Sequence, residues 1–366
     1  MNTRVVRVIL LSFLLAVSAM PVRAESDERT RLVMFTGGRA LRVTRDEREA
    51  WAYQWPAVYF AARFQGDEVT FAFDDSNNNF DVLVDGRNVA VLKKPGAGSF
   101  SFRDLGPGEH TVRVEKRTET QFAVGAFKGF FVANEENALP AAKAERAIEF
   151  IGDSLTVGYG NTSATTQCTP EELFENTDSQ LSFGPLVAKH FAAAYQVNAF
   201  SGLGMVRNFD GRQHPKYRLP MIYPRALFDD PTPDDTPWEP QIFVIGIGGN
   251  DFSSPIRPDE PWGTEEKFVA DYEKTYVAFM KDLRAKNPRA LLLMTWTSDR
   301  GAAYPKSAQR ILEKLRAAGV KRVDSLVYPK LERTGCDGQP SLHDDTLIAG
   351  LLQDYIEARP DVWNWK

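Results

Sequence analysis

The chain lacks two features that would place it on nucleic acid or within a membrane. No stripe of lysine and arginine occurs along its 366 residues, and the formal net charge is −5. Binding to a phosphate backbone needs such a basic surface, so nucleic acid is not an expected partner. Beyond the N-terminal segment there is also no long uncharged apolar run that could span a membrane. The mature protein is therefore expected to be soluble.

The N-terminus has the pattern of a secretory signal peptide. Arg4 and Arg7 precede an apolar run over residues 8–19, and a cleavage-site pattern ends at Ala24. The run is too short to span a bilayer comfortably, although a retained anchor is the alternative interpretation. We expect residues 1–24 to be removed and the mature chain to be secreted or periplasmic.

Residues 25–137 show the period-two alternation of an all-β domain. Apolar side chains recur at every second position over residues 58–64 and 69–73, and Asp85-Gly86 is typical of a hairpin turn. Short strands with regular turns favour a jelly-roll-like β-sandwich. The candidates for exposed, carbohydrate-binding aromatics are Trp51, Tyr53 and Trp55. Packing in the core or between domains is the commoner role of such side chains.

Residues 138–146 have the composition of a linker, and strands alternate with helices over residues 147–366. Strands are predicted at 147–151, 196–200, 242–247, 291–296 and 323–327, and helices at 186–195, 268–283, 308–317 and 347–356. This alternation predicts a three-layer α/β/α domain with a parallel sheet covered on both faces. Sites in such sheets form at the carboxyl ends of the strands.

Polar motifs follow the predicted strands where that rule places a site. Ser154 lies in Gly-Asp-Ser-Leu after the first strand, Gly202 follows the second, and Asn250 lies in Gly-Gly-Asn-Asp after the third. Asp337 lies between the last strand and the last helix. An acyl-transfer enzyme needs a nucleophile and hydrogen-bond donors for the oxyanion. Each motif alone is weak, but their joint order predicts a serine-hydrolase site that differs from the Gly-x-Ser-x-Gly elbow.

The two cysteines of the chain lie beside these segments. Cys168 and Cys336 could pair in an oxidising compartment. Closing so long a loop would stabilise the fold by about 4–5 kcal/mol in the chain-entropy model. Two separate free thiols are the alternative, and the disulfide is preferred because both cysteines adjoin the proposed site.

The motifs resemble those of the SGNH/GDSL hydrolases, and most closely carbohydrate esterase family two. Residues 150–161 are similar to the first block of that superfamily, Ser201-Gly202 to the second, residues 248–251 to the third and residues 335–341 to the last. Residues 55–60 and 116–119 are similar to the N-terminal jelly roll of the family. The resemblance implies a secreted esterase that removes acetyl groups from plant polysaccharides such as xylan and glucomannan, without a metal or other cofactor.

The resemblance also implies residue roles. Ser154 would be the nucleophile, its own N–H, the Gly202 N–H and the Asn250 side chain would form the oxyanion hole, and Asp337 would orient the base. Asp153 and Asp251 are expected to cap turns. The expected partner is an acetylated polysaccharide or oligosaccharide, and the mature chain is expected to be a monomer without a membrane association. Candidate sugar-stacking residues, each with core packing as the safer interpretation, are Tyr159, Trp262 and Trp296.

The last block departs from the family at one position. The family pattern is Asp-x-His-Pro, whereas this chain has Gln339 where the general-base histidine stands. A glutamine side chain is not basic and cannot accept the serine proton at neutral pH. The four histidines of the chain are His110, His190, His214 and His343.

His343 is the candidate base nearest to Gln339 in the sequence. It lies near the start of the last helix, where the helix dipole lowers the pKa of an imidazole and favours the neutral form. A solvent-exposed histidine in the first turn is the alternative. His110 is expected at the surface, His190 in a helix, and His214 in a Pro-rich loop as a remote candidate base.

Three hypotheses follow from the glutamine. The chain is an active deacetylase with His343 as the base, or a weak or inactive esterase that still binds acetylated or plain glycan. Alternatively, Gln339 is a substitution introduced into a working enzyme. The geometry separates the first from the others, since it requires His343 to lie near both Ser154 and Asp337. A binding protein built on a degenerate hydrolase is the non-enzymatic alternative.

Overall fold

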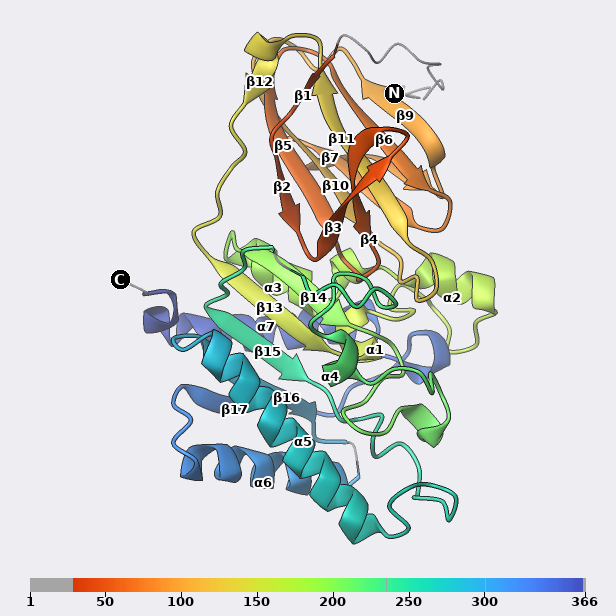
Figure 1. The fold of residues 1–366 in the computed structure, drawn as a ribbon, viewed down its shortest axis with the longest axis vertical. Coiled ribbons are helices and arrows are strands. Elements are labelled where there is room, and N and C mark those ends of the chain that lie inside the picture. Colours follow the sequence, from red (N-terminus) through yellow and green to blue (C-terminus); the bar gives the residue numbers. More distant parts are fainter. Residues whose placement is uncertain (1–28, 235, 300, 365–366) are drawn as a thin grey trace, which may run out of the picture.

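An antiparallel β-sandwich is stacked on a parallel-sheet α/β domain (Figure 1). The computed structural model describes residues 29–234, 236–299 and 301–364. The predicted signal peptide, residues 1–24, lies outside them. This architecture confirms the fold class predicted from the alternation patterns.

The sandwich consists of two six-stranded sheets, in which neighbouring strands run antiparallel. One sheet has the order β3-β4-β11-β6-β9 with β1 beside β11, and the other has β12-β5-β10-β7-β8 with β2 beside β5. The strands are β1 Thr30–Arg31, β2 Met34–Gly37, β3 Ala40–Arg45, β4 Arg48–Tyr53, β5 Tyr59–Gln65, β6 Val69–Asp75, β7 Asn79–Val84, β8 Arg87–Lys93, β9 Gly96–Phe102, β10 Glu109–Lys116, β11 Gly125–Val132 and β12 Ala138–Leu139. Because β12 pairs with β5, the sandwich continues through Leu139, into the predicted linker.

The period-two pattern fills the space between the two sheets with aromatic side chains. Phe60 on β5 and Phe127 on β11 stack with ring centroids 4.4 Å apart, and Phe73 on β6 meets Phe127 at 5.2 Å. All three are buried. Alternating side chains along each strand point to opposite faces, so each of these strands contributes one apolar face to the core.

The α/β domain has a five-stranded parallel sheet with the order β14-β13-β15-β16-β17. Its strands are β13 Ala147–Gly152, β14 Ala194–Ala199, β15 Ile242–Gly246, β16 Leu291–Thr297 and β17 Val323–Tyr328. The helices are α1 Ser154–Val157, α2 Pro170–Asn176, α3 Phe183–His190, α4 Leu219–Ile222, α5 Glu265–Lys286, α6 Ala303–Ala317 and α7 Leu342–Glu357. Of these strands, β13 comes first in the sequence and lies between β14 and β15, so the strand order reverses at β13. Sites in such sheets form at this reversal, and the site is therefore expected at the carboxyl ends of β13, β14 and β15.

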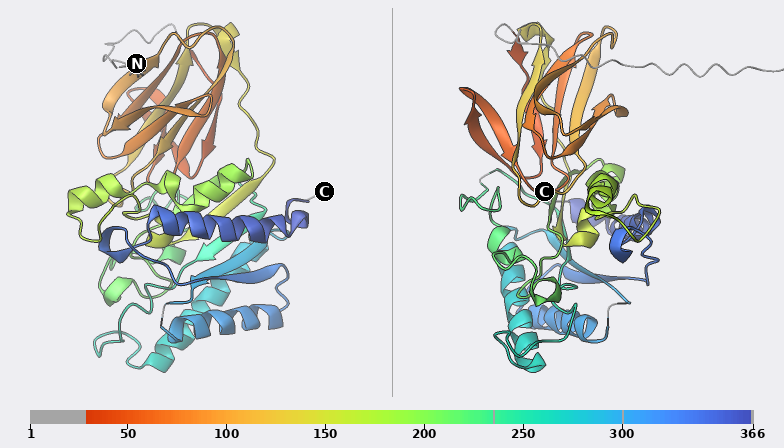
Figure 2. Two further views of the ribbon diagram at one scale, coloured as in Figure 1. Left: turned by 180° about the vertical axis from the view of Figure 1, so that it is seen from behind. Right: turned by 90° about the vertical axis from the view of Figure 1, so that its right-hand side faces the viewer.

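Helices cover both faces of this sheet. Ile148 on β13 packs in one cluster with side chains of α3 and α7, whereas Ile151 packs in another with side chains of α5 and α6. Figure 2 shows the two helical layers on opposite sides of the sheet. No helix in the described ranges is long and apolar enough to cross a membrane.

One helix predicted from the sequence is shorter in the structure. Helix α3 ends at His190, and β14 begins at Ala194, within the predicted helix 186–195. Ala192 has φ of 49° in the turn between them. Periodicity alone does not separate a buried strand from a helix segment in a short apolar run, which explains the error.

The aromatics Tyr53 and Trp55 pack inside the protein instead of facing solvent. Both are fully buried. The Trp55 indole N–H donates to the carbonyl of Arg225 in the α/β domain at 3.1 Å, and Tyr53 donates to Asp75 at 2.8 Å. Trp51 is half-buried against the guanidinium of Arg31. These aromatic residues therefore pack in the core and at the domain interface, which is the alternative to carbohydrate binding expected from the sequence.

Lys116, at the end of β10, is a buried cation beside the domain interface. Its ammonium donates to the carbonyls of Gln54 and Trp55 at 3.2 and 3.3 Å. Burial lowers the pKa of Lys116 to about 8 from its ordinary 10.5, although the charges of Asp75 and Glu119 oppose the shift. The folded chain therefore binds fewer protons than the unfolded chain between these pH values. Its free energy of unfolding should rise with pH in that window.

Lys116→Met is expected to remove this pH dependence. Relative to the variant, the parent should gain about 1.5 kcal/mol in free energy of unfolding between pH 8 and pH 9.5. Urea unfolding of both proteins at the two pH values measures the difference, and other titrating groups cancel in it. Equal pH slopes for the two proteins would contradict the burial argument.

Candidate active site

Ser154 lies where the first strand of the parallel sheet turns into a short helix. Asp153 caps α1, and its Oδ1 accepts the Leu155 N–H at 3.2 Å. Ser154 is the first residue of α1 and is 9% exposed. A Cβ on Gly152 would lie 2.0 Å from Thr156 Oγ1. Glycine is thus required for the tight turn that presents the serine hydroxyl at the strand end.

The predicted oxyanion donors come from the next two strand ends. Gly202, after β14, has φ of 86°, and a Cβ there would lie 2.4 Å from Gln213 Oε1. Asn250, after β15, is buried, and its Nδ2 donates to Leu203 O at 2.7 Å and to Asp153 Oδ2 at 3.2 Å. Asn250 therefore ties the three strand ends together.

Asp251 holds the loop after β14 from the neighbouring strand end. Its carboxylate accepts the backbone N–H groups of Met205, Val206 and Arg207, each at 2.9 Å. Burial raises the pKa of Asp251 to about 7, against the effect of these bonds. The contacts of Asp153 and Asp251 agree with the turn-capping roles expected for both.

Gln339 occupies the position beside the serine hydroxyl. Its Oε1 accepts a hydrogen bond from Ser154 Oγ at 3.2 Å. Asp337 lies nearby in a left-handed conformation with φ of 54°, and its Oδ2 accepts from the Tyr159 hydroxyl at 3.0 Å. Burial, and then Asp337, raise the pKa of Tyr159 well above its ordinary value. The structure thus brings Ser154, Gln339, Asp337 and Tyr159 together.

His343, the candidate base, faces solvent in the first turn of α7. Its side chain is 68% exposed, and its Nδ1 lies 3.4 Å from Glu332 Oε2, which is also exposed. Ser154 instead pairs with Gln339. Of Gln339 and His343, the structure therefore brings Gln339 to the serine hydroxyl.

The other histidines have partners of their own. His110 pairs with Asp85 at 2.7 Å, and His190 pairs with Glu357 at 2.8 Å. His214 lies against Gly202, since a Cβ on this glycine would be 3.3 Å from the imidazole ring. Burial lowers the pKa of His214, and a hydrogen bond with the backbone of Ser201 opposes this shift. No spacing in the sequence could have placed His214 there, because a long irregular loop carries it.

Of the three predicted sugar-stacking residues, two tryptophans pack against other side chains of the protein, and the tyrosine lies beside the predicted catalytic groups. Trp296 on β16 is buried in the core. Trp262 donates to Asp271 at 2.9 Å and packs edge-on against Phe268 at 5.2 Å. Tyr159, which contacts Asp337, is the one of the three that lies among the predicted catalytic groups.

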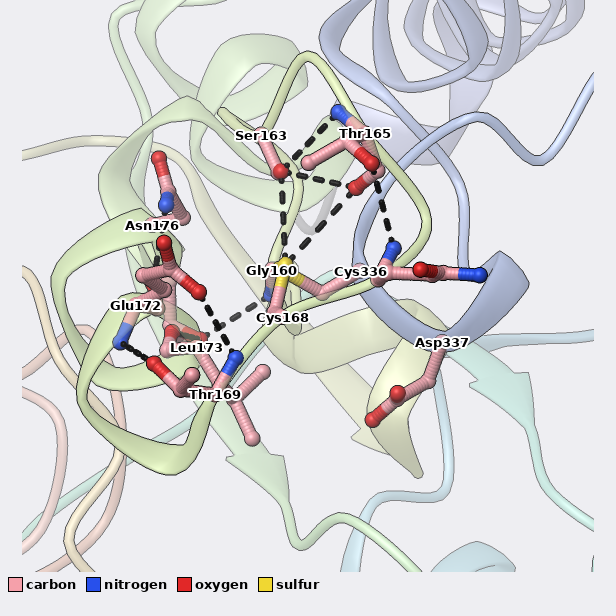
Figure 3. The surroundings of a disulfide bond; sticks show 12 residues. Gly160, Ser163, Thr165, Cys168, Thr169, Glu172, Leu173, Asn176, Cys336 and Asp337 are labelled. Carbon is pink, nitrogen blue, oxygen red and sulfur yellow. Dashed lines mark hydrogen bonds between the residues drawn. A yellow bond between two sulfur atoms is a disulfide. The ribbon is translucent and has the colours of Figure 1, made fainter.

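A disulfide joins Cys168 to Cys336, with Cα atoms 5.5 Å apart. Figure 3 shows Asp337 next to Cys336, one of the two cysteines of this bond. The Asp337 N–H donates to the carbonyl of Thr166 at 2.7 Å, and a Cβ on Gly160 would lie 2.4 Å from Cys336 Cβ. The segment that carries Asp337 and Gln339 is therefore fastened to the loop that follows α1.

Two residues of the β-sandwich also reach the site, and sequence reasoning assigned them no role there. Glu119 accepts the Ser201 N–H at 2.8 Å, and Gln121 donates to Ser201 O at 3.2 Å. A cleft of about 640 Å³, lined by Gly249, Phe252, Phe268 and Tyr304 among others, opens beside Asn250. Within the described ranges, no group of three or more His, Cys, Asp or Glu side chains is arranged to hold a metal ion.

Both parts of the chain match known families. Residues 38–141 match the family described as Carbohydrate esterase 2 N-terminal. Residues 150–337 match the GDSL-like Lipase/Acylhydrolase family. A protein of Cellvibrio japonicus named acetylxylan esterase / glucomannan deacetylase is 40% identical over 340 residues, which cover 92% of this chain and 94% of that protein.

Solved structures agree with these matches. A carbohydrate esterase whose active site is described as having divergent catalytic and non-catalytic binding functions superposes with a TM-score of 0.86 and 39% identity, covering 92% of this chain and all of that one. A family two carbohydrate esterase from Clostridium thermocellum, in complex with cellohexaose, has a TM-score of 0.76 and 25% identity, covering 91% of this chain and 100% of that one.

Proposed function

Because this chain belongs to carbohydrate esterase family two, within the SGNH/GDSL hydrolases, we propose that it binds acetylated plant polysaccharide at Ser154 and removes acetyl groups only slowly. The observation that carries the proposal is the hydrogen bond from Ser154 Oγ to Gln339 Oε1 at 3.2 Å. A carboxamide oxygen accepts a hydrogen bond but does not take up the proton at neutral pH, so the serine remains a hydroxyl.

The proposed reaction has two steps. Ser154 Oγ bonds to the acetyl carbonyl carbon, its proton passes to the sugar oxygen, and the bond between that oxygen and the carbonyl carbon breaks. Water then bonds to the carbonyl carbon of the acetyl-enzyme, the bond from that carbon to Ser154 Oγ breaks, a proton returns to Oγ, and the acetyl group leaves as acetic acid. Both steps need a group that accepts a proton and returns it, and the loss of such a group typically costs about 10²–10⁴-fold in rate.

Binding of the ester does not depend on the missing base. The Ser154 N–H, the Gly202 N–H and the Asn250 side chain would donate weakly to the acetyl carbonyl oxygen of the ester and more strongly to the oxyanion that forms from it. The cleft beside Gly249 offers the partly exposed ring of Phe252 to adjoining sugar units. Xylan and glucomannan are the proposed polysaccharides, since the Cellvibrio japonicus relative is named for both.

The proposed place of action is outside the cytoplasm. The disulfide between Cys168 and Cys336 supports it, because disulfides persist in oxidising compartments. If Gln339 is a substitution introduced into a working enzyme, the geometry of the site is the same, and we expect the same binding and the same slow hydrolysis of this chain. The exposed position of the His343 side chain beside Glu332 disfavours the hypothesis that His343 acts as the base of an active deacetylase.

Calorimetric titration of the parent with an acetylated xylo-oligosaccharide tests the binding. We expect saturable binding, with the acetyl groups still present when the ligand is recovered. The same oligosaccharide after chemical deacetylation is the matched control and should bind more weakly, because it offers no carbonyl to the oxyanion donors. Failure of the acetylated ligand to bind, or its rapid deacetylation, would overturn the proposal.

A further inference from the structure

A loop of the β-sandwich fixes both backbone groups of Ser201, the residue before the oxyanion glycine. Glu119 Oε1 accepts the Ser201 N–H at 2.8 Å. Gln121 Nε2 donates to the Ser201 carbonyl oxygen at 3.2 Å and also to Glu119 Oε1 at 3.2 Å. The two side chains therefore form a clamp, here called the Glu119–Gln121 clamp, that reaches from one domain into the other.

The clamp acts on the peptide unit that carries the predicted oxyanion donor. The Ser201 carbonyl and the Gly202 N–H belong to one planar trans peptide, so they point in opposite directions. A hydrogen bond to Ser201 O consequently sets the direction of the Gly202 N–H. Gly202 has φ of 86° and no side chain of its own to hold that orientation.

The loop that carries the clamp is itself braced. The Gln54 amide donates to the backbone carbonyl of Gln121 at 3.0 Å, and its Oε1 accepts the Phe228 N–H of the α/β domain at 2.9 Å. Burial raises the pKa of Glu119, while its bonds to Ser201 and Gln121 and the buried Lys116 favour the charged form. A buried carboxylate is costly unless it is hydrogen-bonded, and its strongest partner is the Ser201 N–H.

We propose that Glu119 and Gln121 are positioning residues that aim the Gly202 N–H at the substrate carbonyl, so that the β-sandwich is part of the catalytic apparatus. This inference rests on the proposed function, in which Gly202 is an oxyanion donor. It gives Glu119 and Gln121 of the sandwich a role beyond stability, because without them only His214, among the described residues of the α/β domain, would bond the Ser201 backbone from a side chain.

Gln121→Leu in the full chain carrying Gln339→His tests the proposal by kinetics. The substitution removes the donor to Ser201 O and keeps a similar volume. We expect kcat for acetyl-ester hydrolysis to fall by up to about 10²-fold with KM nearly unchanged, because the lost alignment matters most in the transition state. Gln65→Leu, at an exposed position of β5, is the matched control and should leave kcat unchanged.

Hydrogen–deuterium exchange of the parent, with and without Gln121→Leu, supplies a readout that needs no activity. Exchange at residues 201–203 should increase while the rest of the α/β domain stays protected and the thermal midpoint stays close to that of the parent. If Gln339→His is itself inert, the proposed function fails and exchange alone decides the clamp. Unchanged kcat and unchanged exchange, or a loss of kcat that follows global destabilisation, would overturn the inference.

Discussion

Gln339→His is expected to raise the rate of acetyl-ester hydrolysis by about 10²–10⁴-fold over the parent. The glutamine already lies within 3.2 Å of Ser154 Oγ, so an imidazole on the same backbone can reach the serine proton. Asp337 lies two residues away and can orient the ring. A neutral imidazole accepts the proton that the carboxamide leaves on the serine. Hydrolysis of 4-nitrophenyl acetate by the two purified proteins measures the effect.

The pH dependence of the same variant distinguishes a new base from a general increase in reactivity. The rate should rise with pH through the titration of a single imidazole, near its ordinary pKa of about 6.5. Adding Ser154→Ala should abolish the gain, because the base then has no nucleophile to activate. A variant that is no faster than the parent, or that stays fast without Ser154, would contradict the assignment of the site.

Replacing both cysteines with serine is expected to lower the free energy of unfolding by about 4–5 kcal/mol. The disulfide closes a loop with a sequence separation of 168, which strongly restricts the unfolded chain. It also fastens Cys336, next to Asp337, to the loop after α1 (Figure 3). Hydrogen–deuterium exchange at the backbone amides of residues 335–341 should therefore increase by more than the global loss in free energy of unfolding would cause.

Urea unfolding with and without dithiothreitol separates the bond from the substitutions. The reductant should destabilise the parent by about the same amount and should leave the double-serine variant unchanged. An unfolding midpoint of the parent that does not respond to the reductant would show that the disulfide does not stabilise the folded state.

Local pattern was sufficient to predict both architectures and the strand ends that carry the polar motifs. Period-two alternation in the first part and strand–helix alternation in the second each follow from residues close together in the chain. The pattern was insufficient at Ala194, where a buried strand begins inside a predicted helix. Parallel pairing with β13 forms that strand, and β13, residues 147–152, is distant from it in the sequence.

The contacts that define the site are also long-range. Ser154 and Gln339 are separated by 185 residues, and Gln121 and Ser201 by 80, across a domain boundary. The family resemblance placed Gln339 at the position of the general base, but no rule based on neighbouring residues states which side chain meets the serine. The position of His343 in solvent and that of His214 against Gly202 could likewise not be read from neighbouring residues in the sequence.

Turnover of the parent beside His343→Ala, with 4-nitrophenyl acetate and with acetylated xylo-oligosaccharide, tests directly whether the site lacks a general base. We expect slow hydrolysis that is the same in both proteins, because Gln339 occupies the place of the base and His343 lies beside Glu332 in solvent. Rapid hydrolysis by the parent that is lost in His343→Ala would show instead that His343 is the base.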